Sequence, residues 1–507
     1  MVTSTSAPFV AGEYHADSAA ISLDFSAADL RGARAAYDAL SPVEAESAEQ
    51  FVARICSYDA AQTVHSTVSL NVLAPFLTYE HEAEHHRIVA TTPFGLLVWR
   101  IFQALRVNLE FLLHAESRPV FHDFEGSTRP AVDTVERWLN EGKGDPPTYA
   151  DQVSFECHVL RTYLGTLLDG RGMTRAAFAS LANLAEKILA SRSGVEAHRR
   201  IVIGSQSEGL LPLVPDGVPT ALEIMEASAV LNEEALLVSK RVAPDLLEAW
   251  QSASLHGLYA TAHEYFRRRF GFVRFGKLAA DLSFCGPIDI CSTQSDALPI
   301  DLLHPSLLLD RIARHAEGRA LPMAMLRKEY APIPFDDELF GGGIAAGLRA
   351  VAHAELWNDN FISPRRDSSE APRPLDSPID MVEVAINHAQ RLQAGFKDAI
   401  GSRLQGFGRH SNMLVQETPY APRLIAFRDM LAFPRIAETR KDESGEAKEL
   451  REQLEVQHLL REYASSCAVR KVVLNVPPPQ FLLRDATSYS ESDFRGFVAA
   501  AYRSHFM

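Results

Sequence analysis

Apolar residues recur at helical spacing through most of the chain. The run from Phe94 to Leu113 is apolar almost all the way round and contains only three charged residues, Arg100, Arg106 and Glu110. A helix that is apolar on every face belongs inside a large helical assembly. The same spacing predicts further helices over residues 149–192, 221–240, 245–269, 379–402 and 443–467.

Proline-rich and turn-rich segments interrupt this pattern. Pro75 and Pro93 each stand where the first turn of a helix would begin, and Thr91-Thr92 supplies a cap before the second. Residues 117–148 are rich in turn-forming residues and are predicted to be an irregular connector. Short β-like runs are found at residues 200–203 and 471–474. The predicted fold class is mainly α, a multi-helix globular assembly with few short strands.

The length of 507 residues suggests two to four domains, and the pattern along the chain favours two or three. Residues 363–378 are polar and proline-rich without periodicity, which is typical of a linker. The first 20 residues are rich in Ser, Thr and Ala and are expected to be flexible. The predicted division is a tail at 1–20, an N-terminal helical domain at 21–204, a central helical region packed on it at 205–362, the linker, and a C-terminal helical region at 379–507.

Composition narrows the function classes. The chain is 47% hydrophobic, which excludes wholesale disorder, and its formal charge of −15 disfavours a protein that grips nucleic-acid backbones non-specifically. The longest uncharged apolar stretch, residues 66–79, is too short to span a membrane and is broken by Pro75. No basic residue precedes Arg31, so no signal peptide is expected. The five scattered cysteines fit a reducing compartment, and the expected location is the cytoplasm.

The sharpest motif is HEAEH at residues 81–85. Residues four apart share one face of a helix, so His81 and His85 can both direct a ring nitrogen at one metal ion. Glu82 would then polarise a water molecule on that metal and act as the catalytic base. A solvated or ion-paired cluster, with Arg87 and Arg100 near the carboxylates, is the alternative interpretation.

Two histidines and a water leave a zinc ion one protein ligand short. Glu110 is the nearest candidate, but in a tight antiparallel hairpin it would lie about two turns beyond the histidines. A better candidate lies in the apolar helix 221–237, where Glu226 and Glu233 fall two turns apart on one inward face. Buried carboxylates need a metal, a cation or a proton, so either a metal ion or a buried arginine would satisfy them.

Residues 81–86 (HEAEHH) and 226–233 (EASAVLNE) resemble two segments of a group of helical zinc metallopeptidases. In that group a His-Glu-x-x-His helix is joined to a later helix of the Glu-Gly-Trp-Ala-x-x-x-Glu type. Here Ala227 and Ser228 replace the Gly and Trp, Glu84 replaces a residue that is usually uncharged, and the gap between the segments is long for the group. The likeness implies three zinc ligands and a base, which are His81, His85, Glu226 and Glu82.

A different metal chemistry uses some of the same residues. Helical di-iron sites combine two Glu-x-x-His pairs with two further glutamates, and residues 82–85 and 455–458 are two such pairs. Glu455 lies on a highly charged helix face and is expected to face solvent. His256 and His263, seven residues apart on the predicted helix 245–269, would be alternative iron ligands.

The leading hypothesis is a metal-dependent hydrolase, peptidase-like, with one zinc ion. A di-iron oxidase is the second metal-based reading. The rival from another class is a non-enzymatic helical interaction protein whose histidines and glutamates are structural. The sequence indicates neither a particular substrate nor a particular protein partner.

Overall fold

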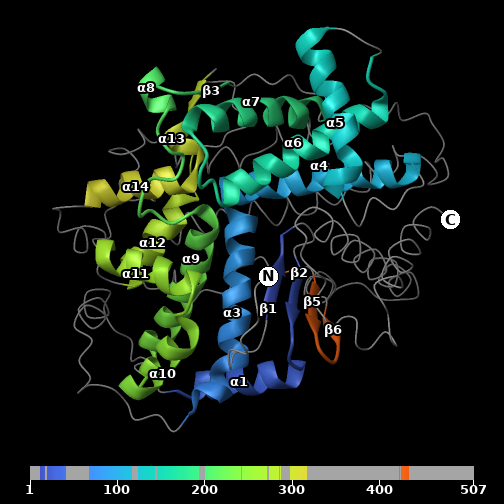
Figure 1. Cartoon of the computed structure of the whole chain (residues 1–507). Helices are drawn as coiled ribbons and strands as arrows, with labels where there is room; N and C mark the ends of the chain where they lie inside the picture. The colour runs from blue at the N-terminus through green and yellow to red at the C-terminus, as the bar shows by residue number, and fades with distance from the viewer. Residues whose placement is uncertain are drawn as a thin grey trace, which may run out of the picture.

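The computed structural model describes residues 12–16, 20–40, 68–116, 124–142, 146–192, 200–240, 242–270, 273–284, 286, 297–316, 422 and 424–432. Within these residues it contains thirteen helices and two small sheets (Figure 1). The predicted mainly α fold is confirmed.

The helices are α1 (Ala27–Ala39), α3 (Leu70–Thr91), α4 (Pro93–Glu116), α5 (Phe124–Glu141), α6 (Tyr149–Leu168), α7 (Arg175–Arg192), α8 (Gln206–Gly209), α9 (Ala221–Ser239), α10 (Pro244–Ser254), α11 (Leu258–Phe270), α12 (Val273–Ser283), α13 (Ile300–Leu303) and α14 (Pro305–Ala316). The strands are β1 (Gly12–His15), β2 (Ala20–Leu23), β3 (Arg200–Val202), β4 (Ala297–Pro299), β5 (Leu424–Phe427) and β6 (Leu431–Ala432).

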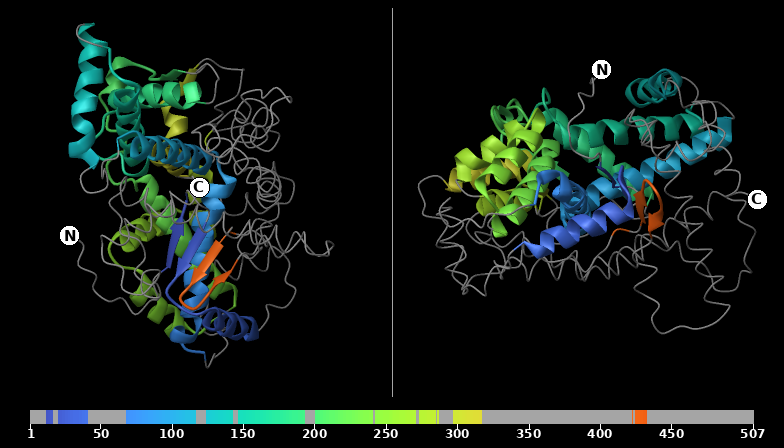
Figure 2. Two further views of the ribbon diagram at one scale, coloured as in Figure 1. Left: turned by 90° about the vertical axis from the view of Figure 1, so that its right-hand side faces the viewer. Right: turned by 90° about the horizontal axis from the view of Figure 1, so that it is seen from below.

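Helix α3 lies between α9 on one side and strands β1 and β2 on the other (Figure 1). Seen from a second direction, α4 to α7 are grouped at one end of α3 and the four-stranded sheet lies beside it (Figure 2). Helix α9 begins at a capping box, in which the Thr220 hydroxyl accepts the N–H of Glu223 and the Glu223 carboxylate accepts the N–H of Thr220. This cap fixes where α9 starts, and therefore which of its residues face α3.

The four-stranded sheet joins segments that are far apart in the sequence. Its order is β1-β2-β5-β6, in which β2 runs parallel to β5 and the two outer pairs are antiparallel. Strands β2 and β5 are buried over their whole length. Leu23 and Phe427 belong to one buried apolar cluster with Ala83 of α3, so the sheet covers one face of that helix.

Helices α3 and α4 meet at a sharp turn. The Thr92 hydroxyl accepts the N–H of Gly95 at 3.1 Å, and α4 begins at Pro93, which confirms the cap and the start predicted there. A Cβ atom at Gly95 would collide with the backbone of Val89, so this close approach requires glycine. The two helices cross and do not form the antiparallel hairpin considered for Glu110, whose side chain lies outside the described residues (Figure 1).

The apolar helix α4 lies in the interior, as predicted. Leu97, Ile101 and Leu105 are fully buried in the largest apolar cluster, which α4 shares with α6, α7, α9, α12 and α14. Arg100 is buried as well, and the carboxylate of Glu186 lies 3.9 Å from its guanidinium group.

Two sequence-based expectations in the first third of the chain are wrong. Pro75 lies inside α3, which begins at Leu70, because the first turn is held by packing of Leu73 in the cluster that α3 forms with α1, α9 and α10. The segment 117–148 is not an irregular connector throughout, since α5 occupies its middle. Val132 and Val135 are buried and give α5 an apolar face that the turn-rich flanks conceal in the sequence.

Two helices that were predicted as continuous are divided by glycine turns. The segment 245–269 is split into α10 and α11 at Gly257, whose φ of 57° suits glycine. The segment 149–192 is split into α6 and α7 by a turn that contains Gly170 and Gly172, with φ of 57° and 79°. Helical spacing continues across both turns, which is why the sequence pattern does not reveal them.

The strand predicted at 200–203 is confirmed as β3, which pairs in parallel with β4. Residues 12–15 of the segment expected to be flexible form β1. The linker 363–378, the helices 379–402 and 443–467 and the strand 471–474 lie outside the described residues, and the division into domains stays a prediction. None of the described helices has the length and apolar character needed to cross a membrane.

Candidate metal centre

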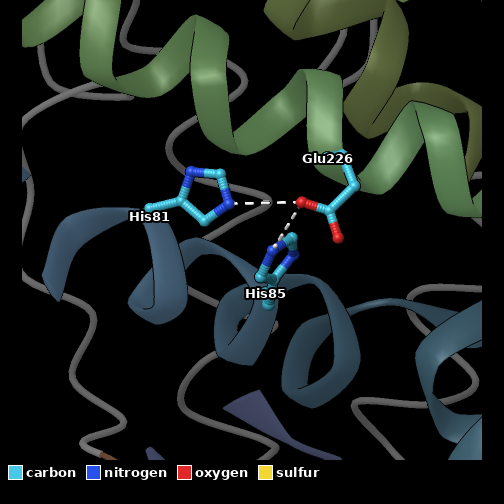
Figure 3. A group of neighbouring side chains, drawn as sticks. All are labelled: His81, His85 and Glu226. Carbon is cyan, nitrogen blue, oxygen red and sulfur yellow. Dashed lines mark hydrogen bonds and ion pairs between the residues drawn. The ribbon is translucent and has the colours of Figure 1, made fainter. Parts of the chain in front are cut away.

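Two histidines of α3 face one glutamate of α9 (Figure 3). Nε2 of His81 lies 3.2 Å from Oε2 of Glu226, and Nε2 of His85 lies 3.3 Å from the same oxygen. The HEAEH motif therefore lies on a helix, and the carboxylate expected to join it from a distant segment does lie beside it.

These distances suit a tetrahedral metal ion. One donor atom from each of the three residues lies within 4.8 Å of the other two. Zinc bonds of about 2.0–2.1 Å in a tetrahedral site place the donor atoms roughly 3.3 Å apart. The two distances to Glu226 already have this value. The cluster of His81, His85 and Glu226 could therefore hold a metal ion.

Without a metal, the cluster is held together by charge. Burial lowers the pKa of His81, but hydrogen bonds to Glu226 and Glu233 outweigh it and hold the pKa well above its ordinary value. Burial raises the pKa of Glu226, but the charge of His85 and the hydrogen bonds from both histidines more than reverse this and lower the pKa. These opposite shifts of the two pKa values favour a charged His81 beside a charged Glu226 in the metal-free protein.

Glu233 contacts His81 at its other nitrogen. Its Oε1 lies 2.7 Å from Nδ1 of His81, and its Oε2 accepts a hydrogen bond of 2.7 Å from Nε1–H of Trp250. Glu226 and Glu233 both face inward, as predicted. In the part of the chain that the structure describes, their cationic partner is histidine and not the arginine of the alternative interpretation.

The second histidine of the motif has no comparable support. Nδ1 of His85 is buried and has no hydrogen-bond partner among the described residues. Its ring lies edge-on to that of His81, with centroids 4.9 Å apart. The two histidines therefore share one glutamate but differ in what holds the far side of each ring.

Tyr259 closes one side of the cluster and was not anticipated from the sequence. Its ring lies edge-on to His81, with centroids 5.9 Å apart, and its hydroxyl is hydrogen-bonded to Glu226. The negative charge of Glu226 is the main cause that raises the pKa of this phenol, and burial adds to it. Tyr259 is in the first turn of α11, so the break at Gly257 sets where it lies.

Glu82, the predicted base, lies further round α3 than the histidines. It is buried against Gly12 of β1, where an added Cβ would come within 2.8 Å of the Glu82 carboxylate. Burial raises the pKa of Glu82, while His81 and His85 oppose that rise. Both histidines are thus close enough to act on its charge.

Glu84, the second glutamate of the motif, contacts cations outside the metal cluster. Glu84 is buried and paired with Arg87 of α3 and Lys277 of α12, so the ion-paired interpretation holds for this residue. Arg100, the other arginine of that interpretation, lies beside Glu186 of α7. The pairing accounts for the charge of Glu84 without assigning it to the metal cluster.

The residues of the di-iron alternative are dispersed. His263 is buried and lies 2.7 Å from Glu234, on a different side of α9 from Glu233. His256 is exposed in the turn before α11 and contacts Tyr259 edge-on. Glu455 and His458 lie outside the described residues.

No protein-family model, curated protein or solved structure matches this chain. The likeness to helical zinc metallopeptidases therefore rests on the two sequence segments alone, and it stays a hypothesis.

Proposed function

We propose that this protein is a metal-dependent hydrolase with one zinc ion bound by His81, His85 and Glu226. The observation that carries the proposal is the position of Glu226 Oε2, within 3.3 Å of Nε2 of both histidines. Three protein ligands of the types His, His and Glu, with a fourth position left for water, are the donor set of catalytic zinc. This set arises from helices whose ligand residues are about 140 positions apart in sequence.

When bound by His81, His85 and Glu226, zinc would supply a water of lowered pKa and a Lewis acid for a carbonyl oxygen. Glu82 follows His81 on the same helix turn and is the residue that we assign as general base. Its carboxylate would accept the proton of the attacking water and deliver it to the leaving group. Tyr259 donates its phenolic proton to Glu226 and so helps to hold that carboxylate in place.

The first test is elemental analysis of the purified protein, followed by removal of the metal and titration with zinc. We expect one equivalent of zinc, and full occupancy again after titration. Absence of any bound metal from the wild-type protein would favour the non-enzymatic reading, in which the same residues form a structural ion-pair cluster. Iron at two equivalents would favour the oxidase.

The second test asks whether Glu82 is a general base or a metal ligand. Glu82→Gln should retain zinc and lose hydrolysis of a fluorogenic peptide library by about 10²- to 10⁴-fold, since a general base contributes roughly that much. Loss of zinc from this variant would make Glu82 a ligand and would contradict the assignment.

A further inference from the structure

Two buried carboxylate–histidine pairs lie one residue apart on α9, and only one of them reaches the metal cluster. Glu233 lies 2.7 Å from His81, and Glu234 lies 2.7 Å from His263. Both glutamates are buried. The pairs have the same chemistry and differ in location, so a role at the metal centre can be separated from a contribution to the core.

The contacts of Glu233 show which groups face each of its two oxygens. The indole of Trp250 is only a donor, so it donates to Oε2 of Glu233. An ionised carboxylate is only an acceptor, so Oε1 of Glu233 accepts the proton carried by Nδ1 of His81. With a metal ion at Nε2, the single proton of the His81 ring would lie on Nδ1, where Oε1 of Glu233 accepts it.

Glu233 is not placed to bind a metal ion that is held by Nε2 of His81. The two nitrogens of an imidazole ring direct their lone pairs to opposite edges of the ring. A metal bound at Nε2 of His81 therefore lies on the other side of the ring from Glu233, which contacts Nδ1. Of the two inward carboxylates of α9, Glu226 therefore lies on the metal side of the His81 ring and Glu233 on the opposite side.

We propose that Glu233, held in place by Trp250, is a positioning residue that fixes the tautomer and orientation of His81 for metal binding. This inference rests on the metal site proposed above. Trp250 is fully buried and fixes one carboxylate oxygen, which leaves the other for His81. A carboxylate behind a histidine ligand raises the basicity of the ring and orients it, and its loss costs about 10- to 100-fold in metal affinity. His85 has no such support among the described residues, so His81 is the prearranged ligand of the pair.

The test compares zinc affinity, measured by competition with a chromogenic chelator, in four proteins. Glu233→Gln places an amide between two donors, and its NH₂ group must face either His81 or Trp250. We expect zinc to bind this variant about 10- to 100-fold more weakly than the wild type. Trp250→Phe keeps most of the ring volume and removes only the donor, so a smaller loss is expected. Glu234→Gln should bind zinc as the wild type does.

The control defines what would overturn the inference. Glu234→Gln disrupts an equally buried carboxylate–histidine pair, so equal weakening of zinc binding in Glu233→Gln and Glu234→Gln would mean a general effect on folding. Wild-type affinity in both Glu233→Gln and Trp250→Phe would equally contradict a positioning role. If wild-type protein binds no zinc, the proposed function itself fails, and that result is separate from any difference among variants.

Nuclear magnetic resonance supplies a readout that a merely structural role would not change. In zinc-loaded protein labelled with ¹⁵N-histidine, we expect Nδ1 of His81 to carry the proton and Nε2 to show the shift of a metal-bound nitrogen. A zinc-bound Nδ1 at His81 would overturn the assignment, even if Glu233→Gln failed to fold.

Discussion

Nζ of Lys277 lies 2.8 Å from Oε1 of Glu84, and this buried contact joins α12 to α3. The same ammonium group lies 2.6 Å from Asp281, and Arg87 lies 3.1 Å from the other oxygen of Glu84. Glu84, the second glutamate of the HEAEH motif, thus stabilises the helix that carries the two histidines.

Lys277→Met should strongly destabilise the protein. It leaves the buried carboxylates of Glu84 and Asp281 without their shared cation, and breaking a buried ion pair costs about 3–5 kcal/mol. The measurement is the free energy of unfolding in urea. Arg268→Met removes an equally short contact, 2.6 Å to Glu264, but one that is exposed, and it should change stability little. Similar losses in both variants would contradict a special role for burial.

His85→Ala should abolish metal binding, because it removes one of the three ligands and leaves too few to hold zinc tightly. His256→Ala is the matched control, since His256 is exposed nearby and belongs only to the iron alternative. Metal content of the two purified variants checks the prediction. Full occupancy in His85→Ala would exclude this site, whereas loss in His256→Ala would point towards the other metal chemistry.

Gly12→Ala should destabilise the protein by about 1–3 kcal/mol, as overpacking does. The new methyl group would lie 2.7 Å from Cγ of Glu82 and 2.9 Å from Cγ2 of Thr78, so β1 or Glu82 must move. Gly32→Ala is the control within α1, where nothing lies within 4 Å of an added Cβ. It should stabilise slightly, by about 0.5–1 kcal/mol, because alanine favours helix. Unfolding midpoints that shift in the same direction would refute the packing argument.

Protonation of His304 should destabilise the protein in mild acid. Its Nε2–H donates to the carbonyl of Thr166 and its Nδ1 accepts the N–H of Ser306, so the neutral ring satisfies both contacts. Burial lowers its pKa from 6.5 to about 4. The unfolded chain therefore binds this proton first as the pH falls. Stability from the neutral ring is complete above pH 6.5 and declines as the pH falls towards 4, by about 3 kcal/mol in total.

The measurement is the free energy of unfolding at pH 7.5 and pH 5 for wild type and His304→Gln. The variant has no titrating ring, so its stability should fall less between the two values. An equal fall in both proteins would show that acid acts elsewhere. His256→Gln, which changes an exposed histidine, should behave as the wild type.

The sequence predicted those parts of the site that depend on local spacing. His81 and His85 share a helix face because they are four residues apart, and the inward position of Glu226 follows from the apolar residues around it. The contacts of Trp250 and Tyr259 arise from how α10 and α11 pack on α9. Helical spacing continues through the break at Gly257, so no pattern along the chain indicates that α11 begins just before Tyr259.

The parallel pairing of β2 with β5 has a consequence for synthesis on the ribosome. Residues 20–23 are synthesised long before residues 424–427, with which they pair. At a translation rate of about 5–20 residues per second, the time between the two segments is roughly 20–80 s. During that time Ile21 and Ala83 lack the strand that later covers them with Ile425 and Phe427. The apolar cluster between the sheet and the histidine-bearing helix is therefore completed only when residues 424–427 have been made.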